Sequence, residues 1–228
     1  MNIAVFGARG RVGSKVVEIA KQRGHTVLPI DISVKTNNPN NNEDDCNSQT
    51  ESKECAATDH IDAVIDFSTA AATAEVCEFC RLHRCGLITG VTGRNEEQTR
   101  LIEQLKTELS VVAKANFSVG VDILHRICEI VAKELADWDC DIVEIHRKGK
   151  SDSPSGTAKS LAASVVRQKS FKKITVHSLR CGSNFGKHEV IFATNGESLT
   201  LTHQAENVEI FAKGAVLSAE QLKRLETR

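Results

Sequence analysis

Residues 2–24 read N-I-A-V-F-G-A-R-G-R-V-G-S-K-V-V-E-I-A-K-Q-R-G, and this stretch decides the fold of the first half of the chain. Its opening run, Asn2–Phe6, is apolar and predicts a short buried β-strand. Gly7, Gly10 and Gly13 come next, and the amphipathic run after them predicts a helix. Glycines placed between a strand and a helix are typical of a loop that binds a dinucleotide.

Each glycine of this loop has its own expected task. Gly7 permits the tight turn, Gly10 lets the backbone approach the pyrophosphate, and Gly13 lets helix and strand pack closely. Two arginines in the loop add positive charge beside the phosphates. The predicted pyrophosphate-binding residues are therefore Gly7, Ala8, Arg9, Gly10, Arg11 and Val12.

The next predicted strand, residues 25–30, ends at Asp31. An acidic residue roughly 20 positions beyond the glycines is placed to bond the ribose hydroxyls of NAD, and it would repel the 2′-phosphate of NADP. We therefore expect NADH as the preferred cofactor, with NADPH also accepted. Residues 35–53 are polar and almost without apolar side chains, so we expect a flexible surface loop there.

Strands and helices alternate through the rest of the first half. Apolar strands are predicted at 61–68, 86–89 and 109–113, with a helix at 96–109. This alternation predicts an α/β fold with a Rossmann-like, doubly wound parallel sheet. Ligands of such sheets lie at the carboxyl ends of the strands, which adds Ser68 and the loops after residues 89 and 113 to the predicted site.

Composition limits the classes of function. The chain has 228 residues and a formal net charge of −1, which gives no global bias toward nucleic acid or membrane. It has no apolar run long enough to span a bilayer and no signal-peptide pattern at its start, so we expect a cytoplasmic protein. Cys77, Cys80, His83 and Cys85 are the one metal-like cluster, but their helical spacing favours small apolar core residues, and no metal is predicted.

The second half predicts an α+β domain. A helix capped near Ser118 is followed by strands at 173–182, 188–194, 197–205 and 207–212, and a closing helix comes last. Asn195-Gly196 predicts a hairpin between two of these strands. We expect a mixed or antiparallel sheet with helices on one face. The predicted domains are 1–117 plus 209–228 for the dinucleotide, and 118–208 for substrate binding and oligomerisation.

Residues 141–166, D-I-V-E-I-H-R-K-G-K-S-D-S-P-S-G-T-A-K-S-L-A-A-S-V-V, carry most of the expected chemistry. The strand at 141–145 delivers His146, Lys148 and Lys150 into a polar loop. A helix follows, with Ser155 or Thr157 as its N-cap. The free N–H groups of a helix start, with cations just upstream, predict a site for a carboxylate or phosphate.

This stretch resembles the signature of the 4-hydroxy-tetrahydrodipicolinate reductases, also called dihydrodipicolinate reductases. The matching residues are Glu144, His146, Lys150, Asp152 and Pro154–Ala158. Arg147 stands where the family often has a second His, and Asp141 where it has Glu. The resemblance implies a nicotinamide-dependent enzyme of the diaminopimelate route to lysine, which reduces a cyclic imine dicarboxylate and forms a homotetramer through the sheet of its second domain.

The resemblance also implies residue roles. Lys150 is the expected proton donor to the ring nitrogen, and His146 assists it. Ser155, Gly156 and Thr157 are expected to hold one carboxylate and Arg147 the other. The nicotinamide half of the cofactor is expected to contact Gly90, Val91, Thr92, Lys114, Ala115, Asn116 and Phe117. Arg180, Gly182, Gly186 and His188 match a further family pattern and are expected to be substrate-side or structural residues.

Two other classes are compatible with the same fold. One is another two-domain dehydrogenase, of the aspartate or homoserine type, but these enzymes lack the H-x-x-x-K-x-D-x-P-S-G-T-A string. The other is a dinucleotide-binding sensor that keeps the fold but has no catalytic turnover. This alternative is supported by Arg147 and by the short first domain.

Overall fold

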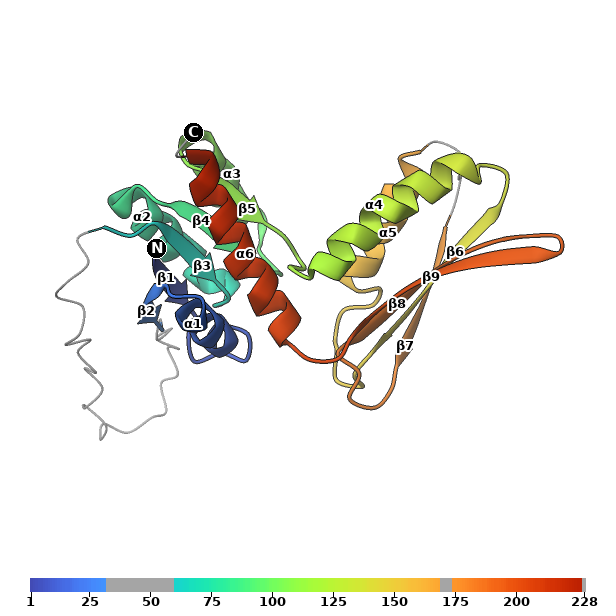
Figure 1. Ribbon diagram of the computed structural model, residues 1–228, viewed down its shortest axis with the longest axis horizontal. Helices are drawn as coiled ribbons and strands as arrows, with labels where there is room; N and C mark the ends of the chain where they lie inside the picture. The colour runs from blue at the N-terminus through green and yellow to red at the C-terminus, as the bar shows by residue number, and fades with distance from the viewer. Residues whose placement is uncertain (32–59, 169–173, 227–228) are drawn as a thin grey trace. The chain divides into compact units, whose positions relative to one another are not determined.

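A computed structural model describes residues 1–31, 60–168 and 174–226 (Figure 1). The predicted loop at 35–53 lies outside the described residues. The chain divides into two compact units, Met1–Ala113 with Ala215–Arg228, and Lys114–Gly214. Among the described helices, none combines the length and apolar character needed to cross a bilayer.

Unit 1, Met1–Ala113 with Ala215–Arg228, is built on a parallel sheet of order β2-β1-β3-β4-β5. Its strands are β1 (Asn2–Phe6), β2 (Thr26–Ile30), β3 (Ala63–Asp66), β4 (Gly86–Thr89) and β5 (Val111–Ala113). The helices between them are α1 (Gly13–Gln22), the short η1 (Ala70–Ala72), α2 (Thr73–His83) and α3 (Glu96–Glu108). The predicted Rossmann-like, doubly wound arrangement is confirmed.

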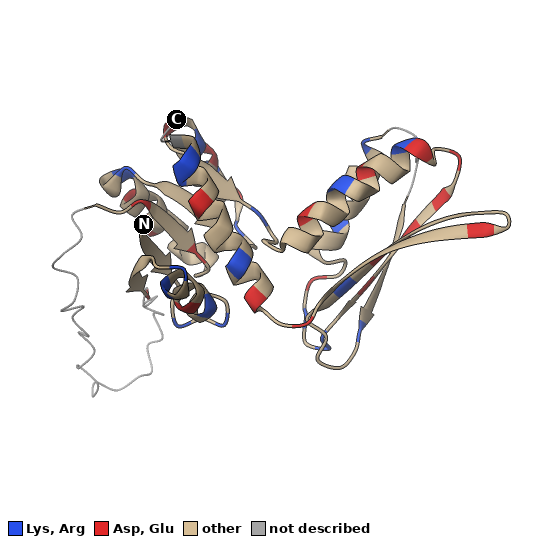
Figure 2. Ribbon diagram, viewed as in Figure 1, with Lys and Arg blue, Asp and Glu red and all other residues tan. Residues whose placement is uncertain are grey.

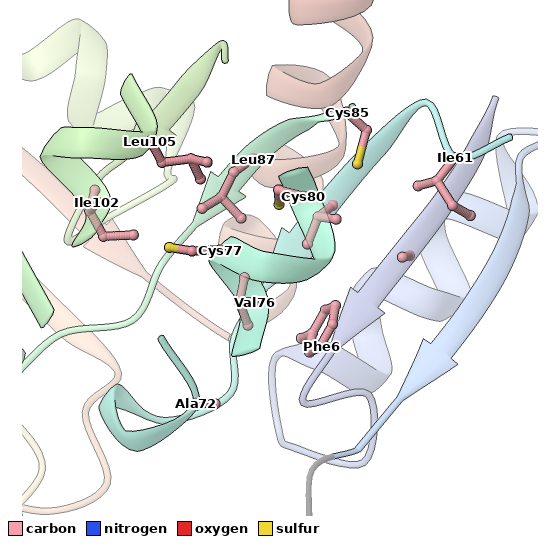
Figure 3. Close-up of a cluster of buried hydrophobic side chains, with 12 residues drawn as sticks. Phe6, Ile61, Ala72, Val76, Cys77, Cys80, Cys85, Leu87, Ile102 and Leu105 are labelled. Carbon is pink, nitrogen blue, oxygen red and sulfur yellow. The ribbon is translucent and has the colours of Figure 1, made fainter. Parts of the chain in front are cut away.

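Helices cover both faces of this sheet. Side chains of α2 and α3 pack on one face, in a cluster that contains Leu87 of β4 (Figure 3). A side chain at the neighbouring position, Gly86, would lie on the opposite face, because side chains alternate along a strand. There Leu222 of α6 (Glu209–Glu226) packs so closely that a Cβ at Gly86 would lie 2.4 Å from one of its methyl groups.

The clustered cysteines of α2 are core residues. Cys77 and Cys80 are fully buried among apolar side chains of that cluster, and Cys85 joins them from the turn after α2 (Figure 3). Burial raises the pKa of the Cys77 thiol, so it stays protonated at neutral pH. The prediction that these residues act as small apolar fillers is confirmed.

Unit 2, Lys114–Gly214, holds a mixed sheet of order β7-β6-β8-β9. β6 pairs parallel with β7 and antiparallel with β8, which in turn pairs antiparallel with β9. Its elements are α4 (Val119–Glu134), β6 (Asp139–His146), α5 (Gly156–Val166), β7 (Thr175–Arg180), β8 (Gly186–Thr194) and β9 (Glu197–Ala205). The predicted hairpin at Asn195-Gly196 joins β8 to β9, and Gly196 adopts a φ of +99° that favours glycine.

Both helices of unit 2 pack on one face of its sheet. Leu124 of α4 and Leu161 of α5 are buried against Ile142 of β6 and Val190 of β8. Basic and acidic residues both occur along the outer side of α4 and along α6 (Figure 2). The predicted α+β unit with helices on one face of a mixed sheet is confirmed.

The prediction of a strand at 207–212 is wrong. Helix α6 begins at Glu209, where the side chain of Asn207 accepts a hydrogen bond from the Glu209 amide at 2.9 Å. The alternation of apolar residues in V-E-I-F-A suggested a strand. The buried residues are Ala212, Ala215, Val216 and Ala219, and their spacing of three and four residues is that of a helix. The sequence fits both a strand and a helix, and packing against the rest of the chain favours the helix.

Candidate active site

The glycine loop after β1 has the geometry expected of a phosphate cradle. Gly7 has a φ of +74°, and a Cβ there would lie 2.7 Å from the carbonyl oxygen of Phe67. A Cβ at Gly13 would lie 2.0 Å from the Gly7 oxygen, so α1 could not approach β1 with any larger residue. Val12, at the N-cap of α1, has no polar side chain to occupy the helix start. These features fit the pyrophosphate of a dinucleotide, which α1 would hold by its first N–H groups.

Asp31 lies beside this loop, as predicted from its position after β2. Its carboxylate oxygens accept hydrogen bonds from the Arg9 backbone N–H at 3.1 and 3.2 Å. The Arg9 side chain is exposed, with its Nε 3.6 Å from the same carboxylate. The structure thus brings together the glycine loop and the acidic residue that were predicted to bind the phosphates and the ribose.

Two further predicted loops follow β3 and β4, which are neighbours in the sheet. Ser68 donates its backbone N–H to the buried carboxylate of Asp66 at 3.0 Å. Gly90 donates its own N–H to the Asp66 carbonyl at 2.9 Å, and a Cβ at Gly90 would overlap the ring of Phe67 at 2.2 Å. Asp66 therefore anchors both loops. Ser68 and Gly90 were predicted to bind the cofactor, whereas Asp66 was predicted only to lie at the ligand-side end of the same strand.

The predicted cofactor residues Lys114–Phe117 lie at the start of unit 2. Lys114 pairs with Asp122 at 2.8 Å, and Phe117 is buried. Asn116 donates its side-chain amide to the hydroxyl of Thr157 at 2.9 Å. A residue predicted at the cofactor thus contacts one predicted at the substrate.

Strand β6 organises the catalytic candidates. Because side chains alternate along a strand, Glu144 and His146 point to the same face. His146 Nδ1 is hydrogen-bonded to Glu144 Oε2. Arg180, on the neighbouring strand β7, donates to the other oxygen of Glu144 at 2.7 Å. The loop before α5 joins the same group, since the Ser155 backbone N–H donates to Glu144 Oε1 at 3.3 Å.

These contacts fix the charge state of the group. Burial alone would raise the pKa of Glu144, but hydrogen bonds from Arg180 and His146 help to outweigh it and hold that pKa at about 2. Burial lowers the pKa of His146 against the opposing pull of Glu144. At neutral pH the Glu144 carboxylate therefore accepts a hydrogen bond from the Nδ1–H of a neutral imidazole, which leaves the unprotonated Nε2 as the acceptor of His146.

The cations of the loop after β6 are less buried. Lys150 Nζ lies 2.6 Å from the carboxylate of Asp152 and remains partly exposed. Burial would raise the pKa of Asp152, but Lys150 outweighs that effect and lowers it, so the Asp152 carboxylate stays ionised. Arg147 has an exposed side chain and is held by its backbone N–H, which donates to the carbonyl of Asn184 at 2.8 Å. The positive charge of Lys150 helps to lower the pKa of the buried His146 imidazole.

Helix α5 begins where the resemblance placed an anion site. Ser155 is its N-cap and accepts from the Ala158 N–H at 3.2 Å, which confirms one of the two predicted caps. Thr157 accepts from Asn116 through its hydroxyl oxygen, so the hydroxyl hydrogen remains to be donated. With the N–H groups of the first turn, this hydroxyl makes a set of donors suited to a carboxylate.

His188 and Gly186 of β8 complete the cluster. The rings of His146 and His188 meet edge to face, with centroids 5.2 Å apart, and His188 Nε2 lies 3.3 Å from the hydroxyl of Ser155. Burial lowers the pKa of His188 to about 4, so it is neutral. Gly186 has a φ of +150°, which favours glycine, and a Cβ there would lie 3.0 Å from His146 Nε2.

Glu144, His146 and His188 are the one group of metal-type ligands that the described residues bring within 4.8 Å. Both carboxylate oxygens of Glu144 are already engaged, by Arg180 and by His146. A cation here would have to displace the guanidinium or stand beside it. We interpret the three residues as a hydrogen-bond network.

Comparison with known proteins follows the same division into two halves. Residues 1–117 match the model of the dihydrodipicolinate reductase N-terminus, and residues 120–228 match that of its C-terminus. The chain belongs to the dihydrodipicolinate reductase family. Family members named 4-hydroxy-tetrahydrodipicolinate reductase include one from Thermosipho africanus, which is 32% identical over 96% of this chain and 90% of its own length. Another, from Stenotrophomonas maltophilia, is 34% identical over 98% of this chain and 92% of its own.

A solved structure supports the fold independently. The dipicolinate-bound dihydrodipicolinate reductase from Paenisporosarcina sp. TG-14 superimposes with a TM-score of 0.75 at 22% identity, covering 98% of this chain and 95% of that one. The resemblance seen in residues 141–166 is thus confirmed at the level of the family.

Sequence reasoning missed the partners of the catalytic candidates. Glu144 was part of the quoted signature without a role, and Arg180 was expected only as a substrate-side or structural residue. A usable signal was the spacing of Glu144 and His146, since residues two apart on a strand share a face. No local signal could show that Arg180 reaches the same carboxylate from another strand.

Proposed function

We propose that this chain reduces 4-hydroxy-tetrahydrodipicolinate to tetrahydrodipicolinate, using NADH in preference to NADPH, in lysine and diaminopimelate biosynthesis. The observation that carries the proposal is the capped helix start at Ser155–Thr157, which follows the Lys150–Asp152 pair in the sequence of a chain of this family. A dicarboxylate needs two anion-binding positions, and these residues together with Arg147 supply them.

The substrate residues have distinct tasks. The first N–H groups of α5 and the Thr157 hydroxyl hold one carboxylate, and Arg147 pairs with the other, since a guanidinium can bind a carboxylate with two hydrogen bonds. Arg147 thus takes the place of the second His of the family.

The hydroxyl leaves as water together with a hydrogen of the neighbouring ring carbon, which gives a conjugated cyclic imine, and reduction of that imine takes up one hydride and one proton. When bound, NADH would supply the hydride to the ring carbon. Lys150 carries an ammonium and donates the proton to the ring nitrogen, where negative charge develops. His146, held as the Nδ1–H tautomer by Glu144, accepts a hydrogen bond at Nε2 and assists that transfer. Asp152 keeps the Lys150 side chain in place, with their charged atoms 2.6 Å apart.

Cofactor preference rests on Asp31. Its carboxylate is fixed by the Arg9 N–H, so it can accept from ribose hydroxyls and repels a 2′-phosphate. The residues we propose for the nicotinamide half are Ser68, Gly90, Val91, Thr92, Lys114, Ala115, Asn116 and Phe117.

We further propose a cytoplasmic homotetramer joined through the sheet of unit 2. The face of that sheet opposite the helices carries Val143, Ile145, Leu179 and Ile191, by the alternation of each strand. Leu179 is 49% exposed, as an apolar residue at a subunit contact would be in the single chain. Light scattering on a Leu179→Arg variant tests this, since an unchanged mass would contradict the assignment.

The test of function is steady-state oxidation of NADH by the purified chain with 4-hydroxy-tetrahydrodipicolinate. Turnover that pyridine-2,6-dicarboxylate inhibits competitively is the expected result. Tight binding of NADH without turnover would favour a dinucleotide sensor instead.

A further inference from the structure

Arg94, the first residue after the Gly90–Gly93 loop, makes a dense set of hydrogen bonds. Its guanidinium donates through Nη1 to the Val91 carbonyl at 2.7 Å and through Nη2 to the Thr89 hydroxyl at 2.7 Å. Its Nε donates to the hydroxyl of Thr73 on α2 at 3.0 Å. The side chain is only 11% exposed, so these bonds form largely out of water.

The same guanidinium neutralises a buried charge. Asp66 is 1% exposed and lies 3.5 Å from Arg94 Nη2. The Thr89 hydroxyl bridges the two, because it donates to Asp66 at 2.8 Å and accepts from Arg94. It also accepts from the Val91 N–H at 3.3 Å, so its one donor and two acceptor positions are all used.

This network fixes the Val91 backbone through both of its polar groups. The Val91 N–H donates to the Thr89 hydroxyl, and the Val91 carbonyl accepts from the Arg94 guanidinium. In a planar trans peptide the C=O and the following N–H point in opposite directions. Holding the Val91 carbonyl on Arg94 therefore directs the Thr92 N–H away from the guanidinium. Asp66 also fixes the loop after β3, because its carboxylate accepts a hydrogen bond from the Ser68 N–H.

We infer that Arg94 is a positioning residue for the nicotinamide half of the cofactor: through Thr89, Val91 and Asp66 it sets the two loops that follow β3 and β4. This inference rests on the proposed function, which places the nicotinamide at those loops. The adenosine half belongs to the glycine loop and Asp31, whose hydrogen bonds to other described residues do not involve Arg94. A defect caused by Arg94 should therefore be confined to one half of the cofactor.

The test compares two ligands by calorimetry on the full chain. NADH carries both halves, whereas ADP-ribose lacks the nicotinamide. The main variant is Arg94→Lys, which keeps the positive charge beside Asp66 but cannot reach the four oxygens together. Thr89→Val removes the bridging hydroxyl in a side chain of similar shape. Arg100→Lys is the matched control, since Arg100 lies exposed on α3.

We expect Arg94→Lys and Thr89→Val to weaken NADH binding about tenfold, the effect of losing roughly 1.4 kcal/mol of charge-assisted hydrogen bonding. Binding of ADP-ribose should stay unchanged in both, which also shows that unit 1 is folded. Arg100→Lys should match the wild type for both ligands.

Two results would overturn the inference. Equal weakening of NADH and ADP-ribose would make Arg94 a general stabiliser of unit 1, and unchanged NADH binding would remove its role altogether. A wild-type chain that binds NADH no more tightly than ADP-ribose would instead contradict the proposed cofactor, and the inference would fail with it.

Discussion

Substituting Glu144 by Gln tests the hydrogen-bond network most directly. Glu144 is fully buried and accepts from Arg180, His146 and the Ser155 backbone. A glutamine keeps the volume but offers one acceptor oxygen in place of two. If that oxygen stays with Arg180, the NH2 group faces His146 Nδ1. The imidazole must then move its proton to Nε2, which removes the acceptor that we assign to catalysis.

The size of the effect on stability follows from the pKa. A carboxyl group whose pKa falls from 4.5 to about 2 on folding contributes roughly 3 kcal/mol, since each tenfold change in acidity is worth about 1.4 kcal/mol. Because the folded pKa is depressed, this contribution is present above the ordinary pKa and is lost as the pH falls toward 2. Glu144→Gln should therefore lower the free energy of unfolding at neutral pH by about that amount and flatten its acid dependence.

The effect on catalysis should appear in kcat. We expect Glu144→Gln to lower kcat roughly 10²-fold with little change in the KM for NADH, because an imidazole in the wrong tautomer fails in the transition state. Denaturant titration and steady-state kinetics measure the two effects. Glu129→Gln on α4 is the matched control, since Glu129 pairs with Arg167 at 2.9 Å at the surface. A Glu144→Gln enzyme with wild-type kcat would refute the tautomer argument, even if its stability fell.

Other outcomes separate the remaining roles. Lys150→Ala should lower kcat by about 10² to 10⁴ as a lost proton donor, and NADH affinity should not change. Thr157→Ala should mainly raise the KM for the dicarboxylate, since binding donors act on ground and transition states alike; a loss confined to kcat would contradict this. Asp31→Ala should weaken NADH binding and narrow the gap to NADPH, and an unchanged ratio of the two affinities would refute the assignment. Replacing residues 35–53 by a short Gly/Ser linker should leave turnover nearly intact, because loop closure depends weakly on length; lost cofactor binding would place that segment at the adenosine.

The parts of the fold that could be predicted are those set by local chemistry. Three predicted features depend only on residues close together in the sequence, and all three are present in the structure. They are the strand at 141–145, the Ser155 cap and the Asn195-Gly196 hairpin. The run at 207–212 could not be decided locally. Its apolar residues fit a strand or a helix, and the buried positions of α6 chose the helix.

The catalytic cluster was only half predictable for a related reason. His146 and Lys150 were found because they lie in one continuous motif, His146 at the end of β6 and Lys150 in the loop after it. The residues that set their chemistry come from other strands: Arg180 lies opposite His146 on β7, and His188 lies opposite Glu144 on β8. The register of the sheet places Arg180 and His188 next to the residues of β6. Register is a long-range property that cannot be read from the spacing of residues along the chain. In unit 1 the same holds for Arg94, whose partner Asp66 ends a different strand. A single sequence therefore identifies the groups proposed to contact the substrate sooner than the groups that set their protonation and direction.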